Sequence, residues 1–272
     1  MEKNYTIKVL DNGYVKYIDS MGSDESIIEA ARMSTGKGFQ NWDKDIGLLD
    51  YLYRHEHMSP FEMPELIIEV QAPIFVFREW HRHRTQSFNE FSARYSKMSG
   101  LHYVPEKSRI AKQSKSNAQA SSDELFNEEY SQLVIDELKH EQELIYSEYS
   151  KMIDSGIAKE VARINTPVSR YSKMRAKSNL RNWLHFLDLR MRNNAQLEIR
   201  QYANAVSEII KDLFPRVYAE FEEHTLHAIK FSKKEMQAIK SLILNPNEIE
   251  DAIKKQNVID KLQIQEFINK LI

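Results

Sequence analysis

Residues 82–95 read Arg82-His83-Arg84-Thr85-Gln86-Ser87-Phe88-Asn89-Glu90-Phe91-Ser92-Ala93-Arg94-Tyr95, so cations alternate with flat rings. A solvated surface could hold the charges, but it would not normally also carry three aromatic side chains with Trp80 just before them. Guanidinium groups bind phosphates through paired hydrogen bonds and stack on aromatic faces. The segment therefore predicts a ligand that is anionic at one end and aromatic at the other, such as a nucleotide or a flavin dinucleotide.

The composition is that of an ordinary globular protein. The 272 residues are 42% apolar and 29% charged, and the formal net charge of −2 argues against a general polyanion binder. We expect one large domain or two small ones. No apolar run approaches the roughly 18–20 residues of a membrane span, and the first residues lack a signal-peptide core, so we expect a cytoplasmic protein without membrane contact.

The chain contains no cysteine, which excludes disulfides, thiolate metal sites and thiol nucleophiles. None of its seven glycines forms the G-x-G-x-x-G pattern of a Rossmann-type site, so phosphate binding must come from arginines and hydroxyl groups. The segment from Arg163 to Arg200 holds seven Arg and two Lys against only Asp188 and Glu198. This local basic excess favours small anionic ligands, although acids elsewhere in the fold could compensate for it.

Hydrophobic periodicity and breaker residues predict a mixture of strands and helices. Residues 5–18 favour two strands joined by a turn at the Asp-Asn-Gly of 11–13, and residues 65–70 favour a third strand. The polar residues 108–122 predict an exposed loop or a disordered insertion. Helices are predicted over 24–33, 45–54, 73–80, 125–153, 178–191 and 195–214, followed by a separate helical tail with a capping box at 232–235 and helices from 245 and over 259–272.

The helix predicted over residues 178–191 carries polar groups on two sides. At 100° per residue its leucines and Trp183 share one face, and Arg181 and His185 share the opposite face. Asn179 and Arg190 lie at the edge of the apolar stripe, so Arg190 cannot easily reach the ligand atom that Arg181 and His185 contact. Two ligands on two sides, or a site shared between subunits, would explain the pattern. Surface arginines with one edge arginine are the alternative.

The segment 82–95 resembles the signature of flavin-dependent thymidylate synthases, in which Arg-His-Arg is followed after seven residues by serine and then by x-Arg-Tyr. Ser59 stands where that family has threonine, His185 where it has asparagine, and Glu79 where it has a glutamine near the substrate. The resemblance covers roughly residues 1–220. It includes three further stretches: His55-Glu56-His57-Met58-Ser59-Pro60-Phe61-Glu62, Val161-Ala162-Arg163, and Asn179-x-Arg181 with His185 and Leu189-Arg190.

The resemblance implies a fold, a reaction and an assembly. We expect an α+β protein with a central antiparallel sheet and several long helices, formed by a catalytic domain over 1–224 and a C-terminal helical extension over 225–272. The implied enzyme is a thymidylate synthase, a methyltransferase that converts dUMP to dTMP with carbon from methylenetetrahydrofolate and hydride from FAD, which NADPH reduces. Without cysteine the chain cannot attack uracil C6 with a thiolate, as the unrelated class of thymidylate synthases does. A homotetramer with active sites between subunits is also implied.

The resemblance assigns a role to each matching residue. Arg190 and Ser92 are the catalytic candidates: a guanidinium beside uracil O2 and N3 would stabilise negative charge developing on the ring, and the hydroxyl would position the substrate. The residues expected to bind FAD are Ser59, Arg82, His83, Arg84, Thr85, Asn89, Glu90, Asn179, Arg181 and His185. The residues expected to bind dUMP are Glu79, Arg82, Glu90, Phe91, Ser92, Ala93, Arg94, Arg163 and Arg190.

Other interpretations of the same motifs were weighed. The histidine pairs at 55/57, 81/83 and 224/227 lack a third ligand at a recognisable spacing, so we expect no metal. A nucleophilic serine needs an adjacent base, and nine residues separate Ser92 from His83. The rival of another class is an RNA-binding module that uses the arginine-aromatic segment. It predicts no tightly bound chromophore and a salt-dependent affinity for long polyanions.

Overall fold

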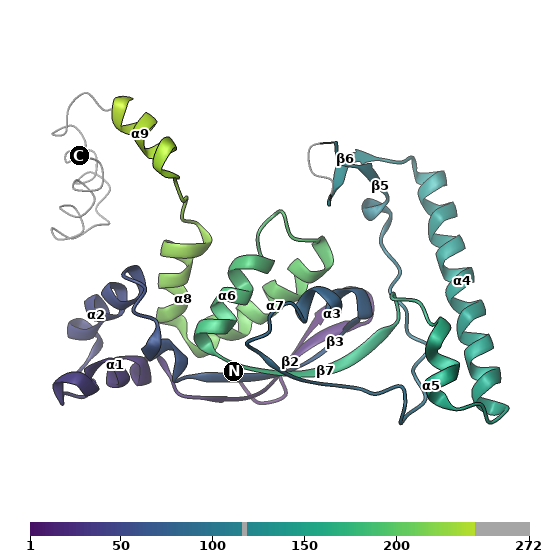
Figure 1. Cartoon of the computed structure of the whole chain (residues 1–272), viewed down its shortest axis with the longest axis horizontal. Helices are drawn as coiled ribbons and strands as arrows, with labels where there is room; N and C mark the ends of the chain where they lie inside the picture. The colour runs from purple at the N-terminus through teal and green to yellow at the C-terminus, as the bar shows by residue number, and fades with distance from the viewer. Residues whose placement is uncertain (116–118, 243–272) are drawn as a thin grey trace. The chain divides into compact units, whose positions relative to one another are not determined.

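The computed structural model describes residues 1–115 and 119–242, and it contains two compact units, Met1–Leu226 and a second that begins at His227. The first unit is an α+β fold around a five-stranded antiparallel sheet, as predicted (Figure 1). Thr225 forms hydrogen bonds with Tyr53 and Arg192 of that unit. The functional division at residue 224 stays a prediction. No helix in the described residues is long and apolar enough to cross a membrane.

The sheet has the strand order β1-β2-β3-β7-β4, and every neighbouring pair is antiparallel. β1 (Thr6–Val9) and β2 (Gly13–Met21) are the predicted hairpin, with Val9 paired with Gly13 across the turn. β3 (Glu65–Pro73) runs beyond its predicted end at residue 70. β4 (Ser87–Glu90) places the middle of the 82–95 segment on an edge of the sheet.

β7 (Tyr171–Asn179) was not predicted from the sequence, although it lies between β3 and β4 and pairs with β3 along its whole length. Its side chains alternate between exposed and buried positions. The exposed positions carry two lysines and Arg175. The alternating buried positions carry two serines, an alanine and a methionine, and a pattern with so few β-branched or aromatic residues gives a weak strand signal. The buried side chains are Tyr171, Ser172, Met174, Ala176 and Ser178.

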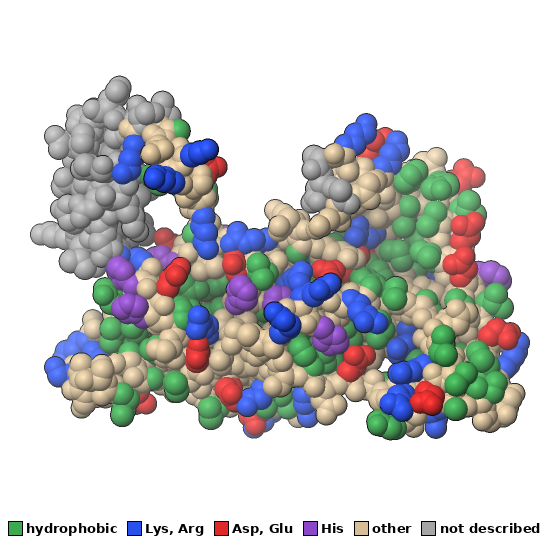
Figure 2. Space-filling view, viewed as in Figure 1, with side chains coloured by type: hydrophobic (Ala, Val, Ile, Leu, Met, Phe, Trp, Pro, Cys, Tyr) green, Lys and Arg blue, Asp and Glu red, His purple; other side chains and the backbone are tan. Residues whose placement is uncertain are grey.

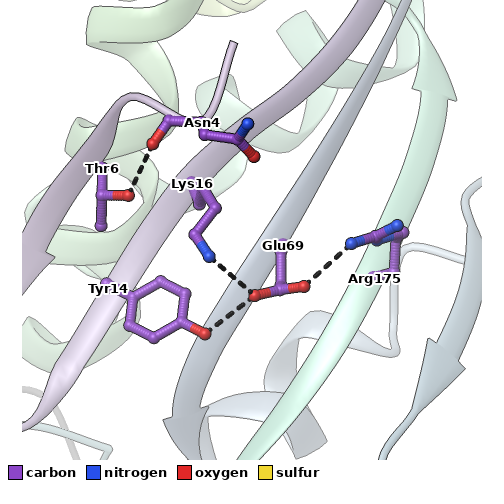
Figure 3. A network of polar contacts seen from close by, with 6 residues as sticks. All are labelled: Asn4, Thr6, Tyr14, Lys16, Glu69 and Arg175. Atoms are coloured by element: carbon purple, nitrogen blue, oxygen red, sulfur yellow. Dashed lines mark hydrogen bonds and ion pairs between the residues drawn. The ribbon is translucent and has the colours of Figure 1, made fainter.

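The other face of the sheet carries charges that bridge three strands (Figure 3). Glu69 on β3 accepts hydrogen bonds from the Tyr14 hydroxyl at 2.9 Å and from Lys16 Nζ at 3.3 Å, both on β2. It also accepts one from Arg175 on β7 at 2.9 Å. Arg175 is half exposed, so its ion pair with Glu69 adds little to stability. The network marks this side of the sheet as the polar one, opposite the core.

Helices cover the inward face of the sheet (Figure 1). α3 (Ile74–Trp80), α6 (Leu180–Arg190) and α7 (Leu197–Leu213) lie over the strands, beside α1 (Asp24–Arg32), α2 (Trp42–Arg54) and α8 (Pro215–Phe221). Trp80 and Trp183 are fully buried and meet edge-on, and the ring centroid of Phe186 lies 4.5 Å from that of Trp80. Burial of large apolar side chains contributes about 1.5–3 kcal/mol each. The end of α3, where the 82–95 segment begins, is therefore anchored in the core.

Gly13 lies where β2 leaves the hairpin turn, packed against Tyr202 of α7. A Cβ at this position would stand 1.9 Å from the Tyr202 hydroxyl oxygen and 2.5 Å from the carbonyl oxygen of Val9. The Tyr202 hydroxyl is held in place because it donates a hydrogen bond to the carbonyl of Gln71 at 2.7 Å. We therefore expect Gly13→Ala to lower the free energy of unfolding by about 1–3 kcal/mol, as forced overpacking does. Thermal or urea unfolding measures the change.

Gly47, inside α2, provides the matched control for this substitution. A Cβ at Gly47 meets no other atom within 4 Å. Gly47→Ala should raise the free energy of unfolding by about 0.5–1 kcal/mol, because alanine has the higher helix propensity. An unchanged stability of Gly13→Ala would contradict the close packing of the hairpin against α7.

Residues 108–122 correct the prediction of a loop or disordered insertion. They overlap the turn η3 (Lys107–Arg109) and two short antiparallel strands, β5 (Ala111–Gln113) and β6 (Ser121–Leu125). Their polar composition reflects exposure of a two-stranded ribbon, since most of its side chains face solvent. The ribbon leads into α4 (Glu128–Asp154), which Asn127 caps by accepting a hydrogen bond from the backbone N of Tyr130 at 2.8 Å.

The predicted helices are present with shifted ends. α2 begins at Trp42 rather than at residue 45 because Asn41 caps it, and α6 begins at Leu180 because the preceding residues belong to β7. α8 and the π-helical turn η5 (Glu222–Leu226) were not predicted. The remaining short elements are η1 (Met33–Thr35), η2 (Ser59–Glu62), α5 (Lys159–Ala162) and η4 (Arg163–Asn165).

The second unit begins with α9 (Lys233–Leu242) in its described part. The predicted capping box is confirmed: the backbone N of Ser232 donates to Glu235 Oε2 at 2.7 Å, and the backbone N of Glu235 donates to Ser232 Oγ at 3.4 Å. The helices predicted from residue 245 and over 259–272 lie outside the described residues.

Candidate active site

The Arg82-His83-Arg84 turn connects the buried end of α3 to β4. Its backbone closes through hydrogen bonds from His83 N to Trp80 O at 2.9 Å and from Gln86 N to His83 O at 3.2 Å. The Trp80 indole also donates to the side-chain oxygen of Gln86 at 2.9 Å. Because both ends of the turn are anchored in the core, the His83 side chain is held inward, whereas Arg82 and Arg84 are exposed.

Arg190 reaches this turn from the C-terminal end of α6. Its Nε donates to Nε2 of His83 at 2.9 Å, and its Nη2 donates to the backbone carbonyl of Glu79 at 3.0 Å. Its Nη1 lies 3.3 Å from the Glu79 carboxylate. Arg190 and Glu79 are both half-buried, so water screens their ion pair only in part. The structure thus brings together three residues that were predicted from separate motifs.

His83 is neutral in this arrangement. Burial, with the charges of Arg190 and His185, lowers the pKa of His83 to about 4. Because Nε2 accepts a hydrogen bond from Arg190, we assign the ring proton to Nδ1. Burial also raises the pKa of Glu79, against the opposing charge of Arg190. A neutral imidazole can hold Arg190 in place but adds no positive charge, so the anionic groups of a ligand must be met by arginines.

A cleft of about 570 Å³ opens beside α6, a size within the range of small-molecule sites. It brings together three of the predicted FAD-binding residues, Thr85, Arg181 and His185. Arg190 does not line this cleft, so the predicted division of α6 into two sides is found, and the rings of His83 and His185 lie 6.3 Å apart. The lining residues are Tyr53, Met58, Glu62, Thr85, Arg181, Asn182, Leu184, His185, Asp188 and Thr225.

Two other predicted residues shape the rim of the cleft. Asn179 is the N-cap of α6: its Oδ1 accepts hydrogen bonds from the backbone N of Asn182 at 3.0 Å and from the Asn182 side chain at 2.8 Å. Ser59 begins η2, which ends at Glu62, and Glu62 forms an ion pair with Arg181. A ligand anion that binds Arg181 must compete with this carboxylate. The FAD-binding roles of Ser59, Asn179 and Arg181 stay predictions.

A second group of predicted residues follows β4. Ser92 and Arg94 flank Ala93, whose burial fixes their turn against α5. Arg94 forms an ion pair with Glu160 at 3.0 Å, and Arg163 follows one helical turn later. Ser92, Arg94 and Arg163 therefore lie in one region. The small core that holds Ala93 consists of Ala93, Met98, Tyr149 and Ala162.

Ser92 has no base beside it among the described residues. Its Oγ accepts a hydrogen bond from the backbone N of Arg94 at 3.3 Å, and Nε2 of His83 is used by Arg190 beyond the other end of β4. The nucleophile interpretation of Ser92 thus lacks the group that would remove its proton. Within the described residues, no hydrogen bond or ion pair joins the Glu79–His83–Arg190 group to the region of Ser92, Arg94 and Arg163.

The remaining predicted residues are on or near the surface. Arg82, Arg84, Asn89 and Phe91 expose their side chains, and neither arginine has a carboxylate partner among the described residues. Figure 2 shows Lys and Arg side chains interspersed with histidines over the centre of one face of the molecule. Exposed guanidinium groups without partners are suited to bind an anionic ligand.

Asp50, Glu220 and His224 are the group in the described residues whose ligand atoms lie close enough to hold a metal ion, all within 4.8 Å of one another. Nε2 of His224 already lies 3.0 Å from Asp50 Oδ1 and 3.3 Å from Glu220 Oε2. The hydrogen bond with Glu220, together with Asp50, raises the pKa of His224 above its ordinary value, although burial opposes this. These contacts account for the cluster as an ion-paired link between α2 and α8.

Seven of the ten cleft residues were not predicted as site residues, and three of these seven come from three different elements. Tyr53 comes from α2, Asp188 from α6 and Thr225 from η5, and the hydroxyl groups of Tyr53 and Thr225 lie 3.0 Å apart. Each belongs to an ordinary amphipathic helix or helical turn, so no local pattern distinguishes it. Only the packing of distant elements brings these side chains to one cleft.

The fold is α+β, and Arg181 and His185 line its cleft. The chain has no cysteine and no glycine-rich loop. Together these features define a class of protein that binds anionic aromatic ligands through side chains. Residues 16–216 match the family described as thymidylate synthase complementing protein. The chain belongs to this family, which confirms the resemblance stated above.

Named relatives in this family are flavin-dependent thymidylate synthases. The chain is 42% identical to the enzyme of Ehrlichia ruminantium (strain Gardel), with 97% of this chain and 87% of that protein covered. It is 45% identical to the enzyme of a Thermus thermophilus strain, with 93% and 91% covered. A crystal structure of the UMP/dUMP methylase PolB from Streptomyces cacaoi bound with 5-Br dUMP is similar, with a TM-score of 0.73, 34% identity, and 82% of this chain and 100% of that one covered.

Proposed function

We propose that this protein is a cytoplasmic flavin-dependent thymidylate synthase that methylates dUMP reductively to dTMP. Methylenetetrahydrofolate is the carbon donor, and NADPH reduces the flavin. The observation that carries the proposal is the convergence of Thr85, Arg181 and His185 on one cleft beside the His83–Arg190 pair. The family membership and the names of the relatives support the same reaction. Because the chain has no cysteine, it needs this route rather than thiolate attack.

The residues of the cleft fit a flavin dinucleotide. The exposed Arg82 and Arg84 supply charge for the pyrophosphate, and Thr85 and His185 supply hydrogen-bond donors and acceptors to the rest of the cofactor. Bound FAD supplies the hydride. The histidine in place of the family's asparagine at 185 keeps a donor there, since an imidazole ring carries at least one N–H in either protonation state.

The nucleotide is held by Arg190 and by the region of Ser92, Arg94 and Arg163. Arg190, oriented by His83 and Glu79, lies beside uracil O2 and N3, donates to O2, and stabilises negative charge on the O2–N3 side of the ring when C5 becomes nucleophilic. Ser92, Arg94 and Arg163 hold the sugar and phosphate. The Glu79 carboxylate would repel a phosphate, but it contacts Arg190 instead, which makes it a positioning residue for that guanidinium.

We further propose a homotetramer in which two subunits complete each nucleotide site. Arg190 and the region of Ser92 and Arg94 share no hydrogen bond or ion pair within the described part of one chain, which supports a nucleotide site completed by a partner subunit. Apolar side chains around that region are exposed, as expected of a surface covered by another copy. They are Phe91, Tyr95, Val161, Ile164 and Val168.

The first test is the absorption spectrum of the purified protein. A flavin spectrum, and dTMP formation that needs dUMP, methylenetetrahydrofolate and a reductant together, is the expected result. A colourless protein that binds long RNA with strong salt dependence would instead support the RNA-binding alternative. Sedimentation equilibrium gives the subunit number independently of activity.

Ser92→Ala should reduce activity without removing it. A hydroxyl that only positions substrate contributes about one hydrogen bond, roughly 0.5–1.5 kcal/mol, so kcat/KM should fall about 2- to 15-fold. Steady-state kinetics with dUMP measures this. A complete loss of turnover, together with a covalent Ser92–nucleotide adduct by mass spectrometry, would show instead that Ser92 is a nucleophile.

A further inference from the structure

Arg170 is a partly buried arginine whose guanidinium holds an unpaired donor. Its Nε is buried and has no hydrogen-bond partner in the structure. Its Nη1 makes one marginal contact, 3.5 Å from the carbonyl oxygen of Tyr171. An arginine has five N–H donors and stays charged at neutral pH, so burying it unpaired is unfavourable. Burial lowers the pKa of Arg170, and Glu90 partly offsets this effect.

The backbone of Arg170 is fixed from both sides. Its carbonyl accepts a hydrogen bond from Ile74 N at 3.0 Å, and its own N donates to Pro167 O at 3.1 Å. An isolated antiparallel β-bridge also joins Arg170 to His102. The side-chain position therefore follows from the backbone, and a substitution that keeps the chain length should leave these contacts in place.

The alternation of side chains along β7 places the Arg170 guanidinium on the same side as residues that are proposed to bind dUMP. Arg170 precedes β7, and residues two apart on a strand share a face, so Arg170 lies on the same side as Ser172. Ser172 Oγ donates to Glu90 Oε1 at 2.8 Å, and Glu90 is two residues before Ser92. Arg163 is close enough to oppose the charge of Arg170. Arg170 thus joins the region of Ser92, Arg94 and Arg163.

We infer that Arg170 is a further nucleotide-binding residue, whose guanidinium meets the phosphate of dUMP beside Arg94 and Arg163. This inference rests on the proposed function. A doubly charged phosphate provides several acceptors for the donors that the fold leaves unused. The protein tolerates the unpaired charge because ligand binding compensates for it, a trade of stability for function that is common at binding sites.

The test compares Arg170→Met with the wild-type holoenzyme. The dissociation constant for dUMP should rise at least about tenfold, as expected for the loss of one charge-assisted contact. Binding of deoxyuridine, which lacks the phosphate, should be unchanged by ligand-observed NMR. FAD content should stay the same, and Tm should not fall, because the substitution removes an unpaired buried cation.

Arg175→Met is the matched control. Arg175 lies on β7, just after Arg170, but on the opposite face of the sheet, where it pairs with Glu69 (Figure 3). Its substitution should leave dUMP binding unchanged. The inference is overturned if Arg170→Met binds dUMP like the wild type, if it weakens dUMP and deoxyuridine equally, or if Tm and FAD content fall together. Wild-type protein that neither binds dUMP nor forms dTMP would refute the proposed function instead.

Discussion

Arg190→Ala is expected to lower the rate of dUMP methylation by roughly 30- to 1,000-fold while the protein keeps its FAD. The loss corresponds to about 2–4 kcal/mol of transition-state stabilisation from one charge-assisted contact with the uracil. FAD should remain because Arg190 does not line the cleft that holds Thr85, Arg181 and His185. Turnover of dUMP and flavin absorbance per subunit measure the two effects separately.

The substitution also leaves the half-buried Glu79 carboxylate without its partner. Burial already raises the pKa of Glu79, and without Arg190 that pKa should rise further, so the fold is expected to lose some stability. The double variant Arg190→Ala with Glu79→Gln removes the unpaired charge and should restore stability but not turnover. This comparison separates the chemical role of Arg190 from its structural one.

Arg200→Ala is the control for Arg190→Ala, because Arg200 sits on α7 and its side chain donates to the exposed side chain of Asn193 at 2.9 Å. It should keep normal turnover. Wild-type turnover in Arg190→Ala would refute the assignment of Arg190. Loss of FAD from a folded Arg190→Ala protein would show that the two sides of α6 are not separate sites.

Local sequence patterns were sufficient for the elements that carry strong local signals. The β1–β2 hairpin has an Asp-Asn-Gly turn between alternating strands, and α7 has a continuous apolar stripe. The same holds for the Arg82-His83-Arg84 turn, whose residues form a contiguous motif. In each case the side chains that fix the structure lie within a few residues of one another, so their spacing alone is informative.

The features that were not predicted from the sequence depend on contacts between distant residues. β7 pairs with β3 and lies against α6, and these partners cannot be read from the strand itself. Without that strand, Arg170 could not be placed on the same face as Ser172. The role of Glu79 was equally hidden, since a carboxylate at a substrate site became interpretable only through its contact with Arg190.

The ribbon formed by β5 and β6 was missed for a different reason. Its sequence is polar and lacks a core, so composition indicated an exposed loop or a disordered insertion over 108–122. One residue contradicts that interpretation: Arg109, in the turn just before β5, reaches the nearly fully buried carboxylate of Glu198 on α7. A single long-range ion pair of this kind leaves no periodic signal, because neither residue is unusual in its own segment.

Glu198→Ala is expected to cost about 3–5 kcal/mol of stability, the usual effect of removing one partner of a buried ion pair. Glu198 accepts hydrogen bonds from Arg109 Nε at 2.8 Å and Nη2 at 3.3 Å, from the Tyr103 hydroxyl at 3.1 Å and from Gln196 at 2.8 Å. All these donors would lose their acceptor. For a unit of this size the loss corresponds to a fall in Tm of roughly 6–20 °C.

The pH dependence of stability identifies the charge as the cause. Burial alone would raise the pKa of Glu198, but the hydrogen bonds and charge of Arg109, helped by Gln196, lower it below its ordinary value. A carboxyl group whose pKa is lower in the folded state stabilises the fold above its unfolded pKa of about 4.3, and this stabilisation is lost as the pH falls through the folded pKa. The Tm of the wild type should therefore fall more steeply than that of Glu198→Gln below about pH 4.3.

Glu128→Gln separates this effect from ordinary surface charge. Glu128 pairs with Lys107 in the same region of the chain, but both side chains are exposed. Its removal should leave Tm unchanged, because solvent screens such pairs. The range from about pH 7 to about pH 3 spans the ordinary carboxyl pKa. If the difference in Tm between Glu198→Gln and the wild type stays constant over this range, the Glu198 charge does not hold the 101–110 segment to α7. The shape of the side chain then holds it instead.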